Sequence, residues 1–159
     1  MTRRTTPLAP VSRRIAMASA LVLTTGLALA GCGGKDSAPK LSVSGAYMPQ
    51  PVTDQMAGAY FVVKNDGGTA DKLTSVTSDL SKDISLHTTN GNKMEHVNSL
   101  PVPANGELKL SSGGDHVMFM GLTHKPTAGQ KVTIELHFAT AAPVKVEVPV
   151  KPADYRPGK

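Results

Sequence analysis

Apolar and polar residues alternate along most of this chain in short runs that turn residues separate. In residues 131–138, Val132, Ile134, Leu136 and Phe138 fall on one face of the predicted strand, and polar residues fall on the other. No segment longer than ten residues keeps a helical period. The runs predicted as strands are 41–48, 57–65, 72–78, 83–89, 93–100, 106–110, 115–120, 131–138 and 143–150. This spacing predicts an all-β sandwich or barrel.

The composition agrees with one folded all-β domain behind a leader. Apolar residues make up 40% of the chain, charged residues 18% and aromatic residues only 4%. Residues 1–31 hold four of the 17 basic side chains and no acid, so most of the formal charge of +5 belongs to them. The remaining chain is nearly neutral, which argues against a nucleic acid as partner.

The first 31 residues follow the pattern of a secretory signal peptide, with a basic start, an apolar run and small residues. The tetrapeptide that ends in Cys32 resembles a lipobox, which predicts cleavage before this residue and its lipidation. A plain secreted protein is the alternative, and the Sec and twin-arginine export routes both stay open. We therefore expect an extracytoplasmic protein that is anchored to the cell membrane by lipid.

Behind the anchor, we expect a flexible tether over 32–40, a folded domain over 41–150 and a loose tail over 151–159. Cys32 is the only cysteine, so the domain has neither a disulfide nor a thiolate metal ligand. This excludes a blue-copper centre and a cysteine nucleophile.

The first candidate ligands lie in a predicted hairpin over 83–97. Asn90-Gly91 suits a two-residue type I′ turn, which would place residues whose numbers add to 181 opposite each other. His87 would then face Met94 on the outer side of the hairpin. His96 shares that side and is interpreted as a bystander, although a ligand role stays open.

The second group lies on the predicted strand 115–120. Its outer face carries His116, Met118 and Met120, while Val117 and Phe119 point to the core. Methionines often fill core gaps, so an ordinary strand is the alternative interpretation. Two histidines and two methionines form a soft, thiol-free ligand set, and such a set favours Cu(I) over Zn(II), Ca(II) or Mg(II).

The spacing of His87, Met94 and, after 21 intervening residues, His116-Val117-Met118 resembles that of the PCu(A)C family of periplasmic copper chaperones. The resemblance covers residues 41–150. It implies a cupredoxin-like Greek-key β-sandwich that binds one Cu(I) through these four residues. It also implies transfer to a copper-accepting protein, typically toward the Cu(A) site of cytochrome c oxidase, with Met120 as a residue that is not required.

The chain departs from the family in two respects. Only six residues separate His87 from Met94, where the family has about ten, and the tail lacks the methionines and histidines found in some members. We therefore expect a compact hairpin and one principal site. A surface lipoprotein that binds a protein partner without metal is the alternative function. No hydrolase motif favours an enzyme, although Asp83, Glu95 and Asp115 leave that class open.

Overall fold

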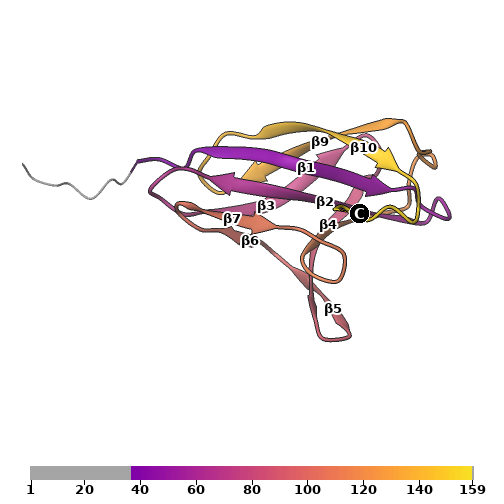
Figure 1. Ribbon diagram of the computed structural model, residues 1–159, viewed down its shortest axis with the longest axis horizontal. Helices are drawn as coiled ribbons and strands as arrows, with labels where there is room; N and C mark the ends of the chain where they lie inside the picture. Colours follow the sequence, from indigo (N-terminus) through magenta and orange to yellow (C-terminus); the bar gives the residue numbers. More distant parts are fainter. Residues whose placement is uncertain (1–36, 159) are drawn as a thin grey trace, which may run out of the picture. The chain divides into compact units, whose positions relative to one another are not determined.

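Strands dominate residues 37–158, the part of the chain that the computed structural model describes (Figure 1). The predicted signal peptide, Cys32 and the first residues of the predicted tether lie outside it. The strands are β1 (Leu41–Pro49), β2 (Met56–Asn65), β3 (Asp71–Ser78), β4 (Asp83–Asn90), β5 (Lys93–Val97), β6 (Leu100–Val102), β7 (Gly106–Lys109), β8 (His116–Met120), β9 (Lys131–Phe138) and β10 (Val144–Lys151). The all-β class is confirmed, and ten strands replace the expected nine because the run 93–100 is split between β5 and β6. Within these residues, no helix is long and apolar enough to cross a membrane.

One strand connects the two halves of the sandwich. The hydrogen-bonded order is β5-β4-β8-β2-β1-β10-β9-β3-β6, with β7 paired to β2. β1 runs between β2 and β10 (Figure 1), antiparallel to the former and parallel to the latter at Met48 and Pro49. The register of β1 shifts between Ser44 and Tyr47, where Gly45 has a φ of 61°. An irregularity of this kind lets a strand turn from one layer to the other.

The core lies between the layers and takes one face of most strands. Val117 and Phe119 of β8 are fully buried there, as the alternation predicts, together with Ile134 and Leu136 of β9. Phe61 of β2 is also buried. Close packing of these side chains holds the backbone of β8 firmly. The opposite face of β8 therefore presents its side chains from a rigid support.

Asn65 at the end of β2 attaches the last residues of the predicted tether to the domain. Its side-chain oxygen accepts hydrogen bonds from the backbone amides of Lys40 (3.0 Å) and Gly67 (2.9 Å), and its amide donates to the Thr69 carbonyl. A side chain at Gly67 would collide with the Ala38 carbonyl. Residues 37–40 are therefore held against the domain.

The predicted loose tail also contacts the domain. The ring of Tyr155 meets that of Tyr47 edge to face, with 5.2 Å between centroids. The backbone amide of Tyr155 donates a hydrogen bond to the Pro152 carbonyl. Within residues 151–158, an aromatic contact thus ties the tail to β1.

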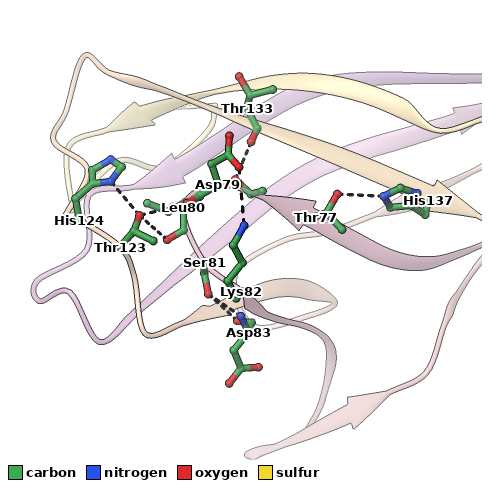
Figure 2. Close-up of polar contacts among 11 residues, drawn as sticks. Thr77, Asp79, Leu80, Ser81, Lys82, Asp83, Thr123, His124, Thr133 and His137 are labelled. Atoms are coloured by element: carbon green, nitrogen blue, oxygen red, sulfur yellow. Dashed lines mark hydrogen bonds and ion pairs between the residues drawn. The ribbon is translucent and has the colours of Figure 1, made fainter.

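A polar corner before β4 aligns that strand with β8 (Figure 2). Ser81 Oγ accepts a hydrogen bond from the Asp83 amide at 3.0 Å. It also donates to the Met120 carbonyl at the end of β8. The Thr123 amide donates to the Leu80 carbonyl at 2.8 Å. These contacts join the start of β4 to the end of β8, and they favour the register that places the candidate ligands side by side.

Candidate metal centre

The outer face of β8 and its neighbours brings most of the predicted ligands into adjacent rows. His87 of β4 stands directly opposite His116 of β8, and Ser85 stands opposite Met118. β8 lies between β2 and β4, so each of its residues has a partner on both sides. Met120 pairs with Met56 of β2 and Asp83 of β4, and Met118 pairs with Gly58 of β2 and Ser85 of β4. Residues directly opposite each other have Cβ atoms roughly 4.5–5.5 Å apart, so neighbours in a row can share a ligand.

The hairpin register differs from the predicted one. Residues whose numbers add to 183 face each other, so His87 lies opposite His96, and Met94 lies opposite Thr89. The two turn residues are Gly91 and Asn92, and only the glycine has a positive φ, 61°. A glycine at the first central position is typical of a type II′ turn, not the predicted type I′.

The shift of two positions leaves the face assignment unchanged, because side chains alternate with a period of two. Met94 still shares the outer face with His87, but it is a diagonal neighbour at roughly 7–8 Å between backbones. The predicted pair of His87 and Met94 was therefore wrong. The residue that faces His87 on β5 is His96, which was interpreted as a bystander.

His116 is on the predicted outer face, yet only 5% of its surface is exposed. The rings of Tyr60 and His87 flank it at 6.5 Å and 5.6 Å between centroids. Its Nδ1 lies 2.8 Å from the Gly114 carbonyl, an acceptor that requires the proton to be on Nδ1. The lone pair of Nε2 is then free for a metal, as is common for metal-binding histidines.

His87 lies between two other imidazoles. Its ring is stacked on His116, with 5.6 Å between centroids, and meets His96 edge to face at 5.7 Å. Its Nε2 is 2.9 Å from Ser85 Oγ. The buried Nδ1 has no hydrogen-bond partner among the described residues. When Nε2 donates its proton to Ser85, Nδ1 carries an unused lone pair.

The surroundings of His87 favour the neutral form of its ring. Burial is the main cause that lowers its pKa from the ordinary value, and the neighbouring His116 and His96 lower it further. A neutral imidazole binds metal, whereas the protonated ring does not. The lowered pKa therefore favours the form of His87 that can act as a ligand.

The thioethers reach the same region through a cavity. Met118, Met94 and His116 line an open cavity of about 720 Å³, together with Met56 and Tyr60. Met94 is 53% exposed on the β4–β5 hairpin, which stands out from the two layers in Figure 1. Met118 is half-buried. The arrangement offers one sheltered and one exposed sulfur to an ion near His116.

Met120 is separate from this group. It lies two residues beyond Met118, about 7 Å further along β8, and pairs with Met56 and Asp83. It does not line the cavity. Within the described residues, no three His, Cys, Asp or Glu side chains are close enough to hold a metal. Beside His116, Met94 and Met118 offer further donors on this face.

Some contributing residues were not identified from the sequence. Ser85 lies two positions before His87 on the same face, so alternation alone could have indicated it. Met56 and Tyr60 enter the cavity through the pairing of β2 with β8, which no local pattern marks. The contact from the Gly114 carbonyl depends on the bend before β8 and has no sequence signal.

Comparison with known proteins finds relatives that are described as lipoproteins. The model of the family described as "Putative lipoprotein LpqE-like" matches residues 41–150. "Putative lipoprotein Lxx21020" of Leifsonia xyli subsp. xyli (strain CTCB07) is 36% identical over 101 residues, which cover 60% of this chain and 61% of that relative. The alignment thus spans less than two thirds of the relative's length.

Solved structures share the fold. The copper-bound PCuAC domain from PmoF2 matches with a TM-score of 0.64 at 19% identity, covering 71% of this chain and 93% of that domain. The Cu(I) form of DR1885 from Deinococcus radiodurans matches with a TM-score of 0.57 at 28% identity, covering 77% of this chain and 83% of that one. These likenesses confirm the expected cupredoxin-like β-sandwich.

Proposed function

The chain belongs to the family of "Putative lipoprotein LpqE-like" proteins and has the fold of PCuAC domains, and from this premise we propose that it is a Cu(I) chaperone. It binds copper and passes it on, and it is not an enzyme. The metal is its cargo. The proposed ligands are His87, Met94, His116 and Met118.

The observation that carries this proposal is the state of the two facing histidines. His116 has its Nδ1 proton engaged by a backbone carbonyl, and His87 has a buried Nδ1 without a partner. A buried nitrogen without a partner costs about 1–3 kcal/mol, and a bound metal would recover that cost. Thioether sulfur from Met118 and Met94 completes a soft ligand set that suits Cu(I).

Release of the ion is favoured by the position of the site at the edge of the sheet. Met94 is exposed on the hairpin, so an incoming ligand of an acceptor can displace its sulfur first. Neutral thioethers and imidazoles need no proton to leave the metal, unlike a thiolate. Copper can then move by successive ligand exchange to an acceptor, for which the Cu(A) subunit of cytochrome c oxidase or one of its assembly factors is proposed.

The proposed location is outside the cytoplasm, with lipid on Cys32 anchoring the protein to the cell membrane. The description of the family and that of the Leifsonia relative both name lipoproteins, which supports this part of the proposal. Mass spectrometry of the membrane-extracted protein should find the lipid on Cys32. A chain that still begins at Met1, or starts at Cys32 without lipid, would contradict the anchor.

Competition titration with Cu(I) under anaerobic conditions tests the metal site. We expect one equivalent to bind, with at least a roughly tenfold loss of affinity in His116→Ala and in Met118→Ala. His124→Ala is the matched control, because His124 lies at the polar corner of Figure 2, away from the candidate centre. Unchanged binding in both site variants would reject this ligand assignment. No Cu(I) uptake by the wild type would instead favour a lipoprotein that binds only a protein partner.

A further inference from the structure

We propose that the outer face holds a second position for Cu(I), formed by His87, His96 and Met94, and that His87 is shared between the two positions. The inner position is the four-ligand site proposed above, so the sulfur of Met94 is also common to both positions. The inference rests on the proposed function, since it divides the same site into a holding position and a release position.

The spacing of the rings supports two positions over a single one with three imidazoles. His87 has one neighbouring ring at 5.6 Å and another at 5.7 Å between centroids. Either separation is short enough for one nitrogen of each ring to lie about 2 Å from a shared ion once the rings turn toward it. Because no three such groups among the described residues converge on one point, an ion lies between His87 and one neighbour at a time.

Each neighbour brings a sulfur with it. On β8, His116 and Met118 are two residues apart on one face, and on β5, Met94 and His96 have the same relation. β4, which carries His87, lies between these two strands. Both flanks of His87 therefore offer one imidazole and one thioether, the combination that suits Cu(I).

Exposure distinguishes the two positions. His116 is 5% exposed, whereas His96 is exposed and Met94 is 53% exposed. The hairpin that carries the outer pair stands away from the layers (Figure 1). The inner position therefore shelters the ion, and the outer position is the one that an acceptor reaches first.

Movement between the positions is an exchange of ligands at constant oxidation state. The bond from copper to His116 Nε2 breaks as a bond to a ring nitrogen of His96 forms. The bond from copper to the sulfur of Met118 also breaks, and that to the sulfur of Met94 stays. His87 remains bound throughout, so Cu(I) is never released to water and no electron is transferred.

In a variant without His116, the Cu(I) affinity of the outer position can be measured by itself. In His116→Ala, we expect residual Cu(I) binding that falls by a further factor of roughly ten or more when His96→Ala is added. The matched control adds His124→Ala instead and leaves the residual binding unchanged. Equal residual affinity in the His116→Ala single variant and in its His96→Ala combination would overturn the proposal.

Transfer kinetics provide the second readout. The single variant His96→Ala keeps one bound Cu(I) but should deliver it to a chromophoric Cu(I) chelator about tenfold more slowly than the wild type, the size of effect expected from one metal-site group. Equal transfer rates would overturn the second position while leaving the chaperone function intact. Absence of Cu(I) binding in the wild type would instead reject the proposed function itself.

Discussion

Ser85 positions the central imidazole of the site, and its substitution gives a graded prediction. Its Oγ lies 2.9 Å from Nε2 of His87, and the hydrogen bond between them fixes the orientation of the ring. A hydrogen bond of this kind contributes about 0.5–1.5 kcal/mol net. Since 1.4 kcal/mol corresponds to a factor of ten, Ser85→Ala should weaken Cu(I) binding by about two- to tenfold.

The matched variant is Ser85→Thr, which keeps the hydroxyl and suits a strand. Competition titration with a Cu(I) chelator should give wild-type affinity for Ser85→Thr and reduced affinity for Ser85→Ala. Thermal unfolding of both copper-free variants separates a local effect from a loss of stability. Wild-type affinity in Ser85→Ala would refute the positioning role, as would an equal loss in both variants.

Four further predictions concern stability and pH. Gly67→Ala should lower the free energy of unfolding by about 1–3 kcal/mol in a denaturant titration, because the new methyl group meets the Ala38 carbonyl. Its Cu(I) affinity, measured by chelator competition, should stay unchanged. Asp71→Ala should lower the free energy of unfolding, measured by chemical denaturation, by roughly 3 kcal/mol, because three backbone amides lose their carboxylate acceptor. An unchanged free energy of unfolding in Asp71→Glu would show that the exact position of the carboxylate does not matter. Phe119→Ala should lower the free energy of unfolding by about 3–5 kcal/mol in chemical denaturation. It should also weaken Cu(I) binding, because β8 loses the core side chain that supports it. The copper-free protein should lose stability as the pH falls through and below about 6.5. The pKa of His87 is lower in the folded protein than in the unfolded chain, so the unfolded chain takes up the proton first. A smaller loss of stability in His87→Gln would confirm that His87 causes this pH dependence.

The strand pattern was predictable because side-chain alternation is a local property. Val117 and Phe119 are in the core and His116 and Met118 are on the other face, as the period of two requires. The same reasoning placed His87 on the ligand face even though the predicted register was wrong. An error of two positions changes partners but never faces.

The hairpin register was not predictable because Asn-Gly fits more than one turn. A type I′ turn centred on Asn90-Gly91 and a type II′ turn centred on Gly91-Asn92 both use the glycine at positive φ. The structure adopts the second. The consequence is chemical, since His96 replaces Met94 as the partner of His87.

By itself, the sequence determined the class of fold, the faces of the strands and the soft character of the ligand set, because alternation and donor chemistry reside in the residues themselves. Only the tertiary structure decided that His116 is buried beside Tyr60, that its Nδ1 meets the Gly114 carbonyl and that His87 lies between two imidazoles. Those contacts arise from strand pairing and from backbone bends. They join residues distant along the chain, and no local pattern of apolar and polar positions records them.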